Sequence, residues 1–150
     1  MSRTIPATAA AVATAAITTT LAAAIAPAAH ADLDQKLFSN ADNTVRCHIA
    51  IHDGATYTKC VSEKGRAAQP ECAPPDVLIP SVSIEPKYTG VSCWNQGFGI
   101  EPAPLKPLQT GKFGTTTVIS GFSGNLYAFD VAKLALVRAG NANKVLFALR

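Results

Sequence analysis

Residues 46–61 read RCHIAIHDGATYTKCV, and this stretch decides the fold. Polar and apolar residues alternate on both sides of Asp53-Gly54, a pair that favours a two-residue hairpin turn. Counting outward from this turn places Cys47 directly opposite Cys60, in a non-hydrogen-bonded pair whose Cα atoms lie about 4.5 Å apart. A disulfide needs a Cα separation of about 4.4–6.8 Å. Turn and cysteine spacing therefore agree in predicting an antiparallel hairpin closed by a Cys47–Cys60 disulfide.

The same register divides the side chains of the hairpin between two faces, because successive residues of a strand point to opposite sides. We expect one face to lie on the core; it comprises Cys47, Ile49, Ile51, Thr56, Thr58 and Cys60. The other face is mildly basic and partly aromatic, and we expect it to meet solvent. It comprises Arg46, His48, Ala50, His52, Tyr57 and Lys59.

All four cysteines lie in the part of the chain that we expect to be exported. An even number of cysteines in an oxidising compartment is typical of disulfides. Their spacing lacks the close C-x2-C pair of zinc sites, so we expect no metal. With Cys47 and Cys60 joined, Cys72 is left to pair with Cys93.

The export prediction rests on residues 1–31, which have the features of a secretory signal peptide. The run from Thr4 to Ala29 holds no charged residue, follows Arg3, and ends at the small-x-small pattern Ala29-His30-Ala31. A retained membrane helix is the alternative, since a span needs about 20 apolar residues. However, the run is mostly alanine and threonine. We therefore expect cleavage before Asp32.

Composition restricts what the remaining domain, residues 32–150, can be. The chain has 150 residues and a formal net charge of +3, with 15% charged residues. This length suits a single domain. The charge is too mild for a nucleic-acid binder, which would carry a basic stripe. We expect no membrane span after cleavage, no cofactor, and an extracellular or envelope protein or glycan as partner.

The rest of the chain predicts a mainly β fold, a small antiparallel sheet or sandwich-like domain stapled by the two disulfides. Residues 62–75 read as a loop. Residues 126–139 are ambiguous: Asp130 to Arg138 followed by Gly140 resembles a short capped helix, but the stretch also fits two strands, 126–131 and 136–139. The expected strands begin at Leu37 and include 77–79 and 82–84, interrupted by Pro80, then 88–94, 115–119 and a final buried strand, 145–149.

Several short motifs resemble small secreted actinobacterial proteins of unknown function. Those proteins open on F-x-S-P-S-G-N-I-x-C, here Phe38 to Cys47, and typically carry six cysteines. Further matches are Thr58-Lys59-Cys60, Gln69-Pro70-Glu71-Cys72, Gly90-Val91-Ser92-Cys93 and Leu108-Gln109-Thr110-Gly111. The resemblance implies a β-rich secreted domain with no known chemistry. It also implies that Ala128 and Ala139 replace a third disulfide and face each other across two strands.

Few residues stand out as candidates for chemistry. His48 and His52 share a strand face but lie about 13 Å apart at about 3.3 Å per residue, so they cannot share a metal ion. Tyr88, Trp94 and Phe98 flank the second disulfide and could form an exposed aromatic cluster that binds glycan or protein. The alternative is that Trp94 packs against Cys72–Cys93. The candidate binding surface is therefore His48, His52, Tyr57, Tyr88, Trp94 and Phe98.

The function expected from the sequence is a secreted binding or interaction module of the cell envelope or extracellular space. It rests on export, on the disulfides and on the lack of an identifiable catalytic motif. Two alternatives stay open. One is a small secreted hydrolase that uses His48 or His52. The other is a secreted protease inhibitor that presents loop 62–75.

Overall fold

The computed structural model describes residues 34–72 and 78–149. The predicted signal peptide lies outside these described residues. Two short 3-10 segments, η1 (Glu63–Ala68) and η2 (Pro70–Cys72), interrupt a chain built of strands. The strands are β1 (Gln35–Asn40), β2 (Val45–His52), β3 (Ala55–Ser62), β4 (Ile79–Glu85), β5 (Tyr88–Trp94), β6 (Ala103–Leu105), β7 (Thr110–Phe113), β8 (Thr116–Ser120), β9 (Leu126–Asp130), β10 (Ala135–Ala139) and β11 (Lys144–Ala148).

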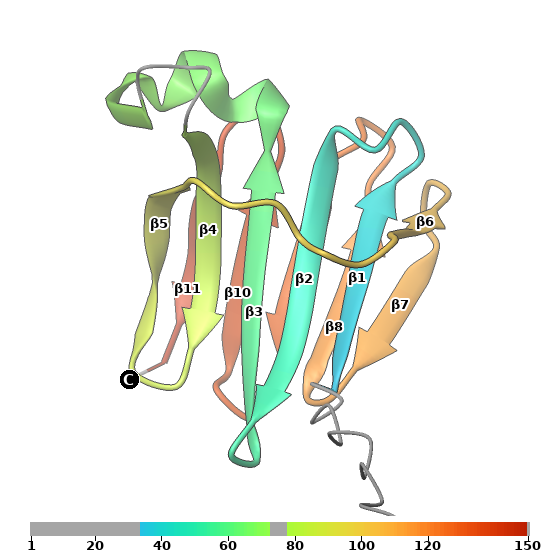
Figure 1. Ribbon diagram of the computed structural model, residues 1–150, viewed down its shortest axis with the longest axis vertical. Coiled ribbons are helices and arrows are strands. Elements are labelled where there is room, and N and C mark those ends of the chain that lie inside the picture. Colours follow the sequence, from blue (N-terminus) through green and yellow to red (C-terminus); the bar gives the residue numbers. More distant parts are fainter. Residues whose placement is uncertain (1–33, 73–77, 150) are drawn as a thin grey trace, which may run out of the picture. The chain divides into compact units, whose positions relative to one another are not determined.

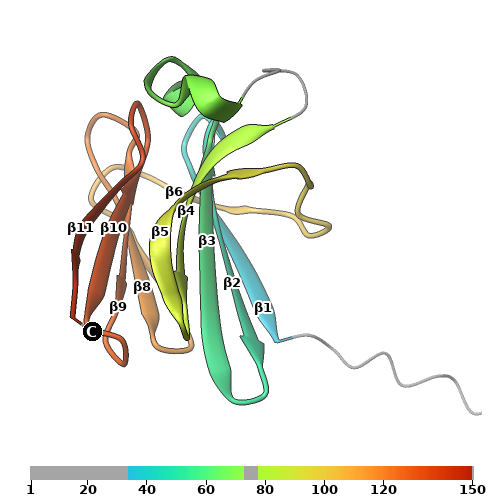
Figure 2. The same cartoon turned by 90° about the vertical axis from the view of Figure 1, so that its left-hand side faces the viewer.

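These strands form two sheets that pack face to face (Figure 1). The six-stranded sheet has the order β5-β4-β3-β2-β1-β6, and the five-stranded sheet has the order β11-β10-β9-β8-β7. Neighbouring strands run antiparallel except β6, which pairs parallel to β1. Figure 2 shows the two layers from the side. The predicted mainly β, sandwich-like domain is confirmed.

The β2–β3 hairpin forms as the sequence predicts. Asp53 and Gly54 have positive φ angles of 50° and 74°, as a tight two-residue hairpin turn requires. Cys47 pairs directly with Cys60 in the register, and their Cα atoms are 4.0 Å apart across a disulfide. The second predicted disulfide, Cys72–Cys93, is also present and joins η2 to β5.

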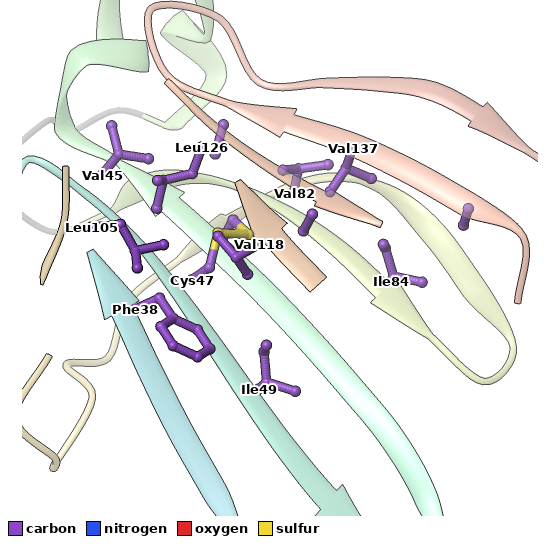
Figure 3. Close-up of a cluster of buried hydrophobic side chains, with 14 residues drawn as sticks. Phe38, Val45, Cys47, Ile49, Val82, Ile84, Leu105, Val118, Leu126 and Val137 are labelled. Atoms are coloured by element: carbon purple, nitrogen blue, oxygen red, sulfur yellow. A yellow bond between two sulfur atoms is a disulfide. The ribbon is translucent and has the colours of Figure 1, made fainter. Parts of the chain in front are cut away.

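The core lies between the two sheets, and the Cys47–Cys60 disulfide is part of it (Figure 3). Both sheets contribute branched aliphatic side chains, and β9 and β10 also contribute buried alanines. Ile51 is only partly buried, but the other expected core residues of the hairpin are buried. The buried cluster comprises Phe38, Val45, Cys47, Ile49, Cys60, Val82, Ile84, Leu105, Val118, Leu126, Ala128, Ala135, Val137 and Ala139.

Residues 126–139 form the β9–β10 hairpin and not the short helix near 130–139. The helix signal has a real local cause. The Oδ1 atom of Asp130 accepts hydrogen bonds from the backbone N–H groups of Ala132 and Lys133, both at 2.9 Å, as a helix N-cap does. The helix-like turn does not continue beyond Lys133, because Leu134 has a left-handed φ of 46° and β10 begins at the next residue.

The expectation that Ala128 and Ala139 face each other is wrong. Ala128 pairs with Val137, and Ala139 pairs with Leu126, so the two alanines are offset by two residues along the hairpin. Both are completely buried on the same face of the sheet. The turn between Asp130 and Ala135 fixes this register. The motif resemblance matched each strand separately and so could not predict how the two strands pair.

Two expectations about strands also need correction. Pro80 does not interrupt a strand: β4 is continuous, and its pairing with β3 begins only at Ser81, so β3 receives no hydrogen bond from position 80. The expected final buried strand is an edge strand. β11 pairs with β10 alone, and Val145, Leu146 and Phe147 are 37%, 45% and 43% exposed. Apolar composition indicates a strand here, but it does not distinguish an edge from the core.

Candidate functional site

The outer face of the six-stranded sheet carries the polar and aromatic side chains that the hairpin register predicts. His48 of β2 lies opposite Lys59 of β3, and Ala50 lies opposite Tyr57. In the neighbouring strand β1, Gln35 lies opposite Ala50 and so reaches the same face. This face points away from the core shared by the two sheets.

A connection between opposite edges of the sheet covers part of this outer face. β5 and β6 are the two edge strands, so the chain between them, residues 95–102, must cross the whole sheet. Figure 1 shows this crossing segment in yellow, running in front of β4, β3, β2 and β1. It brings Phe98 over side chains that are far away in the sequence.

Phe98 stacks between a histidine and a tryptophan of the sheet. Its ring centroid is 4.9 Å from that of His48 and 6.1 Å from that of Trp94, with interplanar angles of 20° and 19°. Offset stacking at such separations is favourable for aromatic rings. The Nζ atom of Lys59 lies 4.6 Å from the Trp94 ring centroid, a cation–π contact. The crossing segment thus contacts the sheet through its one aromatic residue.

Between the crossing segment and the sheet lies a groove of about 370 Å³, which we call the outer groove. Its volume is within the range of small-ligand sites, about 300–1,000 Å³. Aromatic rings, amides and one ion pair line it together. The lining residues are Gln35, His48, Ala50, Tyr57, Thr58, Lys59, Glu85, Trp94, Gln96, Gly97, Phe98 and Gly99.

The charges of the outer groove compensate each other. The Nζ atom of Lys59 lies 3.5 Å from Oε1 of Glu85, and both side chains are partly buried. Burial lowers the pKa of His48 below its usual value, so its ring is neutral at pH 7. The Nε2 atom of His48 lies 2.8 Å from Oε1 of Gln35, which fixes the ring plane. The side chains that line the groove therefore carry no net charge at pH 7.

Two buried polar atoms beside the groove have no hydrogen-bond partner among the residues that the structure describes. They are Nε1 of Trp94 and Oγ of Ser83. Ser83 lies directly opposite Lys59 in the β3–β4 pairing. A buried indole N–H usually finds an acceptor, so an unpaired one beside a groove is unusual.

The structure brings together four of the six candidate residues of the binding surface. His48, Tyr57, Trp94 and Phe98 line the outer groove. His52 does not: it lies exposed at the hairpin tip, with Nε2 3.2 Å from Oδ2 of Asp53. Tyr88 does not either, because its ring folds back over Gly90 and its hydroxyl donates to the carbonyl of Val91 at 2.9 Å.

Trp94 faces the groove and not the Cys72–Cys93 disulfide, since it follows Cys93 in the strand and points to the opposite side. The sequence reasoning missed Gln35, Glu85 and Gln96. Gln35 reaches the groove through the β1–β2 pairing and Glu85 through the β3–β4 pairing, which no local motif reveals. Gln96 reaches it through the crossing segment. Lys59 was not among the candidate binding residues, although the alternation of side chains in the hairpin predicted it on the same outer face.

In the described part of the chain, no three potential ligands gather into a metal site. Nor does this part contain a helix of the length and apolar character that a membrane crossing requires. Comparison with protein-family models, with curated proteins and with solved structures found no match. The outer groove is therefore interpreted from its own chemistry.

Proposed function

We propose that this protein is an exported binding module and that the outer groove is its binding site. The observation that carries the proposal is the convergence of aromatic rings and paired polar groups beneath the crossing segment. A concave site with aromatic walls and a few fixed polar groups is the usual form of a ligand site. Its rigid base, the disulfide-closed β2–β3 hairpin, suits recognition.

Export is supported by the chemistry of the cysteines. Both disulfides form between cysteines of residues 32–150, and disulfides persist mainly in oxidising compartments. The uncharged run of residues 4–29 and the Ala29-His30-Ala31 pattern support a cleaved signal peptide. Amino-terminal sequencing of secreted protein should therefore start at Asp32. Material in the membrane fraction that still starts at Met1 would contradict export by cleavage.

Binding explains the groove better than the two alternatives. A histidine that acts as a catalytic base needs a nucleophile or substrate on one side and an orienting group on the other. His48 instead bonds the amide of Gln35 and stacks on Phe98. An inhibitory loop would offer an extended segment, but residues 63–68 and 70–72 of loop 62–75 form 3-10 turns.

The test is co-sedimentation of the oxidised, exported protein with insoluble cell-envelope material. We expect Tyr57→Ala to reduce the bound fraction, because Tyr57 offers an exposed ring in the groove. Tyr88→Ala is the matched control, an exposed tyrosine of the same sheet outside the groove. Equal retention of both variants, or no retention of the wild type, would overturn the proposal.

A further inference from the structure

We infer that the ligand of the outer groove is an uncharged oligosaccharide. This inference rests on the proposed function and assigns a ligand class to the same site. Three independent features of the groove point to it: charge balance, the mixture of hydrogen-bonding groups, and exposed ring surface.

Charge balance argues against an ionic ligand. The only cation and the only anion that line the groove, Lys59 and Glu85, pair with each other at 3.5 Å. Burial keeps His48 neutral at pH 7. An anionic ligand that paired with Lys59 would leave Glu85 without its partner, and a cationic ligand that paired with Glu85 would leave Lys59 without its partner. A neutral ligand can instead hydrogen-bond to both partners of the pair while it stays intact.

The mixture of donors and acceptors argues for hydroxyl groups. Lys59 donates, Glu85 accepts, and the amides of Gln35 and Gln96 do both. A sugar hydroxyl also donates and accepts, so it can match every one of these groups. A proline-rich peptide, the other usual ligand of aromatic grooves, offers mainly carbonyl acceptors. Its carbonyl groups could accept hydrogen bonds from Lys59 and the amides, but they could not donate to the Glu85 carboxylate as a sugar hydroxyl can.

Ring surface supplies the remaining contact. Tyr57 is 37% exposed at the groove. Aromatic faces carry negative electrostatic potential. The C–H groups on one face of a pyranose ring are polarised positively and fit this surface. Sugar rings could therefore stack on Tyr57 while their hydroxyl groups reach Lys59 and the amides.

The crossing segment has features that would let it adjust to such a ligand. Gly97 and Gly99 flank Phe98, and a Cβ atom at either position would meet nothing within 4 Å. Neither has a positive φ angle. The observed conformation thus does not require glycine at these positions. Their flexibility would allow Phe98 to shift and a ligand hydroxyl to reach the unpaired Nε1 of Trp94.

The test is titration of the oxidised full chain, expressed for export, with defined probes. The probes are hexamers of β-1,4-linked glucose, β-1,4-linked N-acetylglucosamine and α-1,6-linked mannose, a galacturonic acid hexamer as an anion, and a proline decamer. Trp94 is the only tryptophan, so its fluorescence reports on the groove alone. We expect at least one neutral hexamer to bind, with an affinity that changes less than about twofold between low and high salt.

Variants distinguish this inference from its alternatives. Tyr57→Ala should weaken sugar binding by about tenfold or more, a loss expected for a central aromatic contact. A Gly97→Ala, Gly99→Ala double variant should keep its thermal stability and still bind more weakly. Tyr88→Ala should bind like the wild type.

Binding of the proline decamer or the anionic hexamer alone, sensitive to Tyr57→Ala, would overturn the sugar assignment while leaving the binding module intact. Failure of all three neutral hexamers would likewise overturn the assignment. If envelope co-sedimentation also failed, the proposed function itself would fall.

Discussion

The hydroxyl oxygens of Thr58 and Thr116 lie 2.8 Å apart and join the two sheets through a buried hydrogen bond. Thr58 belongs to β3 of the six-stranded sheet and Thr116 to β8 of the five-stranded sheet. Thr116 also donates to Oδ2 of Asp130 at 3.1 Å. Lys133 completes the link, because its Nζ atom bonds Asp130 at 2.9 Å and the carbonyl of Thr56 at 2.6 Å.

This hydrogen bond predicts a measurable effect on stability. Thr58→Val keeps the shape of the side chain but leaves the buried hydroxyl of Thr116 with one partner fewer. We expect a loss of about 1–2 kcal/mol in the free energy of unfolding, measured by urea titration. Thr117→Val is the control, because Thr117 follows Thr116 in β8 and points away from the core. Similar losses in both variants would show that the inter-sheet bond contributes little.

Asp130 should make stability sensitive to acid. Burial works to raise its pKa, but hydrogen bonds from Lys133 and Thr115 outweigh burial and hold the pKa below its usual value. The carboxylate thus contributes stability above about pH 4, the pKa of an unfolded aspartate, and this contribution is lost as pH falls through the lower folded pKa. Asp130→Asn should cost roughly 2–3 kcal/mol at pH 7 and flatten the decline below pH 4.

Urea titrations at pH 7, 4 and 3 measure this difference. Some acid sensitivity will remain in the variant, because the pKa of Asp42 is also lowered, to about 2, chiefly by its hydrogen bond from Lys64. An unchanged slope below pH 4 in Asp130→Asn would mean that the buried carboxylate is not the main acid-sensitive group.

His48 should act in a different pH window. Burial lowers its pKa, so the folded protein takes up the proton less readily than the unfolded chain does. Keeping His48 neutral therefore costs no stability above about pH 6.5, the pKa of an unfolded histidine. The free energy of unfolding falls as pH drops from there toward the lower pKa of the folded protein. Comparing urea midpoints at pH 7.5 and 5.5, we expect a smaller difference in His48→Gln than in the wild type. An equal difference in the two proteins would mean that His48 does not carry this pH dependence.

The part of the fold that the sequence predicts is the part set by local geometry. The Asp53-Gly54 turn determines the register of β2 and β3, and the register determines both the disulfide and the two faces. His48, Tyr57 and Lys59 were therefore placed correctly on the outer face. Asp130 shows the limit of local reasoning: its capping bonds are those of a helix, but Leu134 and the pairing of β10 with β9 turn the chain into a hairpin.

The groove itself depends on long-range order that no local pattern contains. Phe98 reaches His48 only because β6 pairs with β1, which forces the crossing segment over the outer face of the sheet. Glu85 reaches Lys59 only through the β3–β4 pairing. The exposure of β11 follows likewise from its place at the edge of the sheet. These features arise from the order of the strands, which alternation and turn signals leave undetermined.

The register of the β9–β10 hairpin can be tested with new cysteines. Ala128 and Val137 lie directly opposite each other, and opposite residues of antiparallel strands have Cα atoms about 4.5–5.5 Å apart. This suits a disulfide, so Ala128→Cys with Val137→Cys should form a bridge on export and raise stability by up to about 3 kcal/mol, less any strain. Ala128→Cys with Ala139→Cys is the matched control. That diagonal separation is about 7–8 Å, too long for an unstrained disulfide. Alkylation under non-reducing conditions should therefore find two free thiols in the control and none in the test pair. The opposite pattern would mean that the strands are shifted by two residues and that Ala128 and Ala139 do face each other.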